Sequence, residues 1–225
     1  ELLQLRYEEL MRKAKIAAGK TLLYREPPHY ITLGKELPAK ALDEILTDHA
    51  EVFTELKEYY KQTSESDTTK ISFYEDTYSL YNLYRFAHYY EEAYGKYIWL
   101  KSGASLVIEH TEAMTVIDVN TGSVLKKKKQ EDTLFYQINR EAAKEIARQL
   151  RLRNISGIIM IDFINMKDTA QKEKLLSLLD SECKKDRVHC NVIDMTALNL
   201  VEMTRSKVRK PLHEQIRSCM KNNRS

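Results

Sequence analysis

Residues 114–122 read MTVIDVNTG, an apolar stretch that leads into an aspartate and then into an Asn-Thr-Gly turn. Such a run is typical of a buried strand, yet Asp118 lies inside it. Residues 157–164, GIIMIDFI, repeat the pattern around Asp162. Moving an isolated carboxylate into a dry interior is costly, so each acid is expected to be paired, protonated or metal-bound. Two such acids suggest a shared positive partner.

The segments around these two runs predict an α/β or α+β fold, because strands and helices alternate through the second half of the chain. The strands expected there are 104–110, 114–120, 157–164 and 188–194, the helices are 131–153 and 168–184, and residues 198–210 fit a strand or a helix. The first half is expected to hold helices at 1–18, 51–62 and 79–95 and strands at 21–26 and 70–75. The tyrosines of 79–95 could stack on bases, or they could be residues at the edge of a core.

Composition fits a globular protein, with 43% hydrophobic and 31% charged residues in a chain of 225. No apolar stretch is long enough to span a bilayer, and the N-terminus lacks a signal-peptide core. The chain has no initiator Met, as expected of a fragment of a longer protein. The 3 cysteines are irregularly spaced, which favours ordinary thiols in a reducing cytoplasm.

Basic residues gather in the second half of the chain. Residues 1–100 hold 13 Lys+Arg against 17 Asp+Glu, whereas residues 101–225 hold 23 against 16. This is the charge distribution expected of a protein whose partner carries phosphates. The candidate contacts with RNA phosphates are Lys126, Lys127, Lys128, Lys129, Arg148 and Arg151.

A divalent cation is one positive partner that the two acids could share. If their strands are neighbours, both carboxylates emerge at one end of the sheet, where a hard cation such as Mg²⁺ takes oxygen ligands. Asn120 would point to the same face as Asp118 and could hydrogen-bond a ligating carboxylate, or it could serve only the turn before Thr121. Buried ion pairs with Arg or Lys, or helix capping, would satisfy the acids equally well.

Four longer segments resemble the catalytic core of the bacterial RNase E/G endoribonuclease family. They are SLVIEHTEAMTVIDVNTG (105–122), EAAKEIARQLRLRNISGIIMIDFINM (141–166), KKDRVHCNVIDMT (184–196) and LVEMTRSKVRKPL (200–212). The resemblance implies part of an RNase H-like subdomain over residues 1–100, a DNase I-like mixed-sheet subdomain over 101–212 and a tail at 213–225. It implies that Asp118 and Asp162 bind catalytic Mg²⁺, with Mn²⁺ as an alternative, that Asn120 supports them, and that Arg187 lies near the scissile phosphate.

The chain also departs from the family pattern. Nothing in it resembles the family's OB-fold RNA-binding domain or its 5′-phosphate sensor. The zinc-linking C-P-x-C element should follow KPLHEQI, but the chain reads RSCMKNNRS with the lone Cys219. A homo-oligomer is still expected, but the cysteine motif that would link its subunits through zinc is missing from this sequence. Lys101 and Ala104 stand where the pattern has Pro and Gly, and Asn165 stands where it usually has an acid.

The resemblance leads to the expectation of a cytoplasmic, Mg²⁺-dependent endoribonuclease that cuts single-stranded RNA during RNA processing and decay, leaving 5′-phosphate and 3′-hydroxyl ends. One alternative is a non-catalytic RNA-binding or scaffold fragment, which would hold phosphates with a steep salt dependence. Another is a phosphatase or DNase with the same sheet architecture, because a fold does not fix a function.

Overall fold

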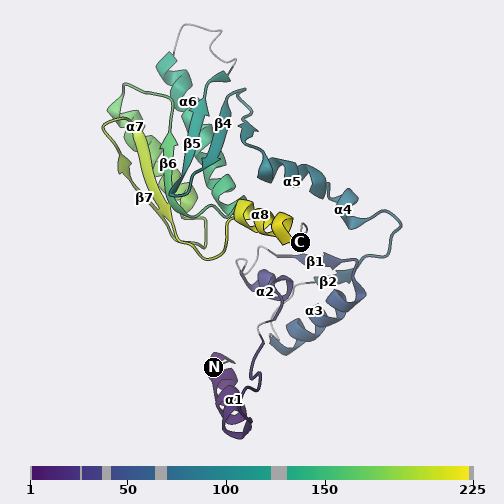
Figure 1. Cartoon of the computed structure of the whole chain (residues 1–225). Coiled ribbons are helices and arrows are strands. Elements are labelled where there is room, and N and C mark those ends of the chain that lie inside the picture. Colours follow the sequence, from purple (N-terminus) through teal and green to yellow (C-terminus); the bar gives the residue numbers. More distant parts are fainter. Residues whose placement is uncertain (1, 26, 37–41, 64–69, 123–130, 223–225) are drawn as a thin grey trace. The chain divides into compact units, whose positions relative to one another are not determined.

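The computed structural model describes residues 2–25, 27–36, 42–63, 70–122 and 131–222, which belong to two compact units, Glu1–Tyr84 and Arg85–Ser225 (Figure 1). The two compact units meet between Tyr84 and Arg85, and the division into subdomains at residue 100 stays a prediction. The subdomain names that the family resemblance implies stay predictions. Within the described ranges, no helix is long and apolar enough to cross a membrane.

The first unit has a small core. Its elements are α1 (Leu2–Ile16), α2 (His29–Glu36), β1 (Glu44–Thr47), α3 (Ala50–Thr63), β2 (Lys70–Phe73) and α4 (Leu80–Leu83). The strands β1 and β2 pair in parallel, and the buried cluster beside them consists of Ile31, Leu56 and Tyr60. Residues 21–25 are irregular rather than a strand, and Leu22 and Leu23 stay exposed. In the described part of the chain, no strand lies beside this segment to form a ladder with it.

The second unit is a six-stranded mixed sheet with helices. Its strands are β3 (Tyr97–Trp99), β4 (Ser105–His110), β5 (Met114–Asn120), β6 (Gly157–Asp162), β7 (Cys190–Met195) and β8 (Leu200–Arg205). Its helices are α5 (Phe86–Tyr94), α6 (Glu131–Leu152), α7 (Thr169–Cys183) and α8 (Leu212–Asn222). The strand order is β3-β4-β5-β6-β8-β7, in which only β5 and β6 run parallel. A mixed α/β fold is therefore confirmed.

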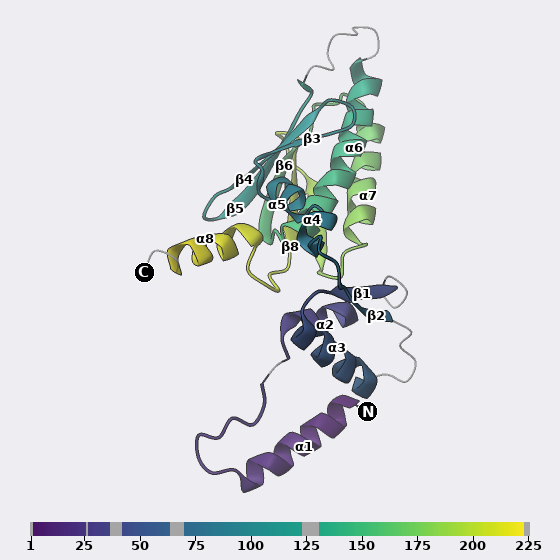
Figure 2. The same cartoon turned by 90° about the vertical axis from the view of Figure 1, so that its right-hand side faces the viewer.

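The sheet buries one face and opens the other. Figure 2 shows α6 and α7 side by side against one face. Along β5, Ile117 and Val119 are buried on that face, and along β6 Ile159 and Ile161 do the same. Because side chains alternate along a strand, Asp118 and Asp162 point to the other face. The two strands are therefore buried on the face that α6 and α7 cover, and among the described residues their other face carries the two acids.

One predicted helix is interrupted in the structure, and one segment with an open assignment is a strand. The helix expected at 79–95 is interrupted at Arg85, whose φ of 51° is left-handed and cannot continue a helix, so α4 and α5 are separate. The ambiguous segment 198–210 contains strand β8, in which Val201 and Met203 alternate with less buried residues. That period of two identifies a strand packed on one face.

Candidate active site

The sheet register brings the two acids together. In the parallel pair of β5 and β6, Asp118 lies directly opposite Asp162. Adjacent strands are about 4.8 Å apart, and opposite residues project to the same face. Both acids lie near the C-terminal ends of their strands, at the same edge of the sheet. The predicted juxtaposition of these carboxylates is therefore present in the structure.

The environment of Asp162 disfavours its charged form. Partial burial raises the pKa of its carboxyl above the usual value, and the negative charge of Asp118 raises it further. Two carboxylates at neighbouring positions repel each other unless a cation lies between them. The pair therefore carries an unfavourable charge interaction that a bound cation would relieve.

Asn120 supports the pair from the next outward-facing position of β5. Its Nδ2 donates a hydrogen bond to Oδ2 of Asp118 at 2.7 Å. This contact fixes the orientation of the carboxylate and leaves its other oxygen available to a ligand. The sequence allowed Asn120 either to hydrogen-bond the acid or to serve only the turn, and the structure contains the hydrogen bond.

The alternatives based on ion pairs are not seen in the described part of the chain. Among those residues, neither Asp118 nor Asp162 lies within an ion pair with Lys or Arg. The same residues contain no group of three or more His, Cys, Asp or Glu side chains that could hold a metal. Two carboxylates and an amide are hard oxygen ligands, and Mg²⁺ is commonly held by one or two carboxylates together with waters and substrate phosphate. The donor set fits Mg²⁺.

Two tight turns hold the polar end of β5 in place. At Gly122, where φ is +55°, an added Cβ would lie 2.5 Å from the carbonyl oxygen of Gly103 in the turn between β3 and β4. The carboxylate of Glu141 on α6 accepts hydrogen bonds from the backbone N–H of Lys101, at 2.7 Å, and of Ser102. The turn after Asn120 is thus packed against a turn that is itself anchored to α6.

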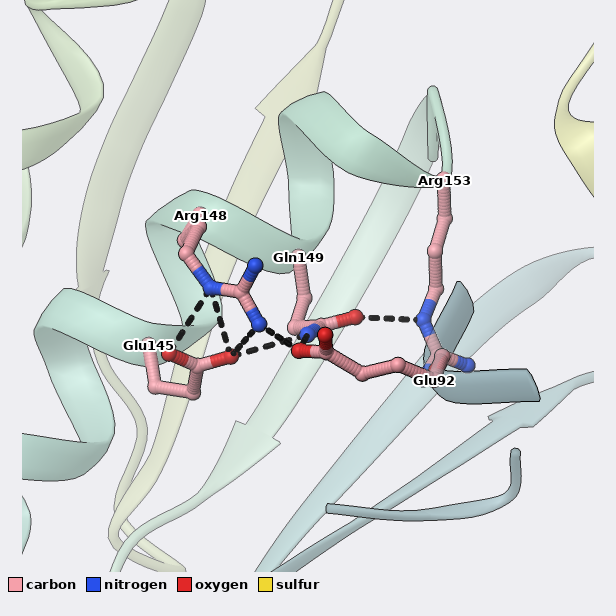
Figure 3. A network of polar contacts seen from close by, with 5 residues as sticks. All are labelled: Glu92, Glu145, Arg148, Gln149 and Arg153. Carbon is pink, nitrogen blue, oxygen red and sulfur yellow. Dashed lines mark hydrogen bonds and ion pairs between the residues drawn. The ribbon is translucent and has the colours of Figure 1, made fainter. Parts of the chain in front are cut away.

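The predicted arginines on α6 do not join the acids. Arg148 donates to Glu145 at 3.0 Å and forms an ion pair with Glu92 of α5, within the network drawn in Figure 3. Arg151 donates to the carbonyl oxygen of Glu182. Both arginines belong to the helix that covers the opposite face of the sheet. Lys126, Lys127, Lys128 and Lys129 lie outside the described residues, so the RNA-binding role of all six stays a prediction.

Arg187 also lies away from the acids. Its neighbour Asp186 forms an ion pair with Arg205, and Arg205 pairs with Gly157 at the first position of β6. Asp162 is the last residue of that strand, five positions further on. At about 3.3 Å per residue, the two ends of β6 are roughly 16 Å apart. The structure therefore does not bring Arg187 to the acid pair, and its predicted role has no support from this geometry.

Further acids lie on the open face and were not singled out from the sequence, among them Glu202 and Asp194. Glu202 pairs with Met160, one outward position before Asp162, and Asp194 pairs with Glu202 across β7 and β8. The alternation in LVEMTR could have placed Glu202 outward if residues 198–210 had been assigned as a strand. These acids widen the negative region of the open face beyond the central pair.

The described surroundings leave Asp162 exposed and Asp118 partly exposed. A cavity of about 450 Å³ in this unit is lined by α5, β4 and the start of α8, and it includes neither Asp118 nor Asp162.

A family model described as the Ribonuclease E/G family matches residues 1–208. Among curated proteins, Ribonuclease G of Haemophilus influenzae is 37% identical over 203 residues, covering 90% of this chain and 41% of that protein. Ribonuclease G of Escherichia coli K12 is 34% identical over 206 residues, covering 92% and 42%. Ribonuclease E of Nostoc is 31% identical over 217 residues, covering 95% and 31%. The chain thus spans about two fifths of the length of the Ribonuclease G relatives.

Proposed function

Because this chain belongs to the Ribonuclease E/G family, we propose that it forms the Mg²⁺-dependent core of a cytoplasmic endoribonuclease that hydrolyses phosphodiester bonds in single-stranded RNA. The observation that carries the proposal is the pairing of Asp118 with Asp162 on the open face of the sheet. The relatives' names, Ribonuclease G and Ribonuclease E, support RNA as the substrate.

The side chains at the site have distinct tasks. Asp118 and Asp162 would hold Mg²⁺, and Asn120 would keep the Asp118 carboxylate oriented through its hydrogen bond. When bound, the metal supplies charge neutralisation at the phosphate and lowers the pKa of a water. Hydrolysis then joins the water oxygen to phosphorus and breaks the bond to the ribose 3′ oxygen, which takes up a proton. The products carry a 5′-phosphate and a 3′-hydroxyl.

Cleavage of an end-labelled, AU-rich single-stranded RNA tests the proposal. The wild-type chain should cut it with Mg²⁺ or Mn²⁺ and stop when EDTA is added, and Asp118→Asn should lower the rate at least about 100-fold, as expected when a metal ligand is lost. A 5′-phosphate-dependent exonuclease should digest the downstream product. Asp180→Asn is the matched control, because Asp180 lies on α7, on the opposite face of the sheet, and forms an ion pair with the exposed Lys184.

Three results would contradict this function: cutting that persists in Asp118→Asn, cutting that survives EDTA, or equal activity on DNA and small phosphoesters. RNA retention at low salt without any metal-dependent cutting would instead support a non-catalytic RNA-binding fragment. The chain's share of its relatives' length makes that second candidate worth testing in the same assay.

A further inference from the structure

Two large aromatic side chains on the edge strand β3 are exposed to solvent. Trp99 is 72% exposed and Tyr97 is 60% exposed, while Ile98 between them is buried in the core. We call Tyr97 and Trp99 the aromatic edge. Aromatic side chains usually bury much of their area, so two exposed rings on one short strand suggest a surface that binds something flat and apolar.

The sheet register places the aromatic edge on the same face as the acids. Two rows of paired residues cross from β3 through β4 to β5, one with Tyr97, Val107 and Asp118 and the other with Trp99, Ser105 and Asn120. Paired residues project to the same face of a sheet. Two strand spacings, about 10 Å, separate the backbone of Trp99 from that of Asn120. Only the small Ser105 side chain stands between them in that row.

The aromatic edge is also fixed in position relative to the acids. Trp99 immediately precedes the turn that Glu141 anchors, and this turn packs against Gly122 through Gly103. The distance between the aromatic edge and Asn120 is therefore set by two packed turns as well as by the strand pairing. A ligand that touches both would bind a preorganised surface.

We propose that Tyr97 and Trp99 form a stacking platform for a nucleobase of single-stranded RNA, next to the phosphate that a metal ion at Asp118 and Asp162 would hold. This inference rests on the proposed function and extends it with a base-binding subsite. A single strand exposes the faces of its bases, and each base stacked on an aromatic side chain strengthens binding without requiring a particular sequence. Duplex RNA hides those faces, so the platform would make the site prefer unpaired RNA.

Cations beside the aromatic edge favour RNA over an apolar protein surface as the occupant. The Lys96 ammonium lies 5.8 Å from the centre of the Tyr97 ring and forms an ion pair with Glu109. Lys101 follows Trp99 by two residues and is exposed. A nucleotide stacked on Trp99 would carry its phosphate past these ammonium groups. A second copy of the chain is the competing occupant, and the experiment below separates the two.

The chain contains a single tryptophan, so its fluorescence reports on the platform directly. Asp118→Asn, which leaves RNA uncut, is titrated with a single-stranded oligonucleotide and with the matching duplex at equal phosphate concentration, while filter retention measures total binding. The single strand should quench Trp99 emission to saturation, with a midpoint that matches retention. The duplex should quench little even where it is retained.

Substitutions in the active chain provide the second readout. Trp99→Leu should raise the RNA concentration for half-maximal cleavage about tenfold, within the range for one lost base stack, with little change in kcat. Trp99→Phe keeps an aromatic face and should recover most of the affinity. Tyr7→Ala is the matched control, because Tyr7 is 62% exposed on α1 and lies in the first unit, outside the sheet.

The outcomes separate this inference from the proposed function. Quenching by single-stranded RNA in a chain that never cuts would support the platform and contradict the nuclease. Metal-dependent cutting with RNA retention but unchanged Trp99 emission would overturn the platform and leave the nuclease intact. Equal quenching by duplex, or an indole already shielded from acrylamide in a chain that sediments as a dimer, would also overturn it.

Discussion

At the scale of single residues, Asp162 combines two opposing demands. The proposed function needs its carboxylate charged, whereas burial and the charge of Asp118 raise its pKa and favour the neutral acid. Asn120 adds a hydrogen bond to Asp118 but carries no positive charge that could offset the repulsion. The repulsion between Asp118 and Asp162 destabilises the metal-free protein, and a cation bound between them would remove that repulsion.

Replacing Asp162 by Asn should therefore stabilise the metal-free chain at neutral pH, because it removes one of two repelling charges. The folded protein holds the Asp162 proton more tightly than the unfolded chain does, so wild-type stability rises as pH falls through the raised pKa. The advantage of Asp162→Asn should shrink over that window. Urea unfolding at neutral and acidic pH measures it.

Added Mg²⁺ provides the complementary measurement. A ligand that binds only the folded state stabilises it, so Mg²⁺ should raise the wild-type free energy of unfolding and leave Asp162→Asn nearly unchanged. Asp180→Asn should respond to Mg²⁺ as wild type does. A less stable metal-free Asp162→Asn, or an equal response of both chains to Mg²⁺, would mean that the pair is no cation site.

At the scale of elements, the turn after β5 determines where Asn120 lies. Gly122→Ala should destabilise the second unit by about 2 kcal/mol or more, because it adds left-handed strain and a contact with the Gly103 carbonyl. Gly157→Ala is an intermediate case, because φ is positive but the new Cβ would meet open space. It should lower the free energy of unfolding by about 1 kcal/mol. Gly19→Ala meets neither obstacle. The urea midpoint of the second unit should decrease in the order Gly19→Ala, Gly157→Ala, Gly122→Ala, because Gly19 lies in the first unit and should leave that midpoint unchanged. Equal midpoints would contradict this.

The elements also show how far the sequence alone could lead. Apolar runs around Asp118 and Asp162 predicted β5 and β6, and the regular spacing in α6 predicted the helix between them. The sequence could not predict whether one or both faces of these strands are covered by helices, because an apolar run looks the same in either case. Trp99 was missed since β3 has only three residues, too few for alternation to be visible. Its place in line with Asn120 depends on pairing across β4, which no local pattern contains.

At the scale of the whole molecule, the two units have very different cores. The first unit buries a cluster of three residues, Ile31, Leu56 and Tyr60, whereas the second buries a continuous layer between its sheet and α6 and α7. The proposed site lies wholly in the second unit, on a sheet whose strands pair with one another. Stability of the site should therefore depend on the second unit alone.

Unfolding of the chain should occur in two steps, because a small core cannot match the stability of a larger one. Far-ultraviolet circular dichroism reports helices of both units, whereas the lone tryptophan, Trp99, reports only the second. The first step should lower ellipticity without changing Trp99 emission, and the second should change both. A chain of residues 85–225 should keep the second step at the same denaturant concentration. Coincident curves for both probes, or loss of that step in the shortened chain, would show that the sheet needs the first unit, and the acid pair would then depend on the entire chain.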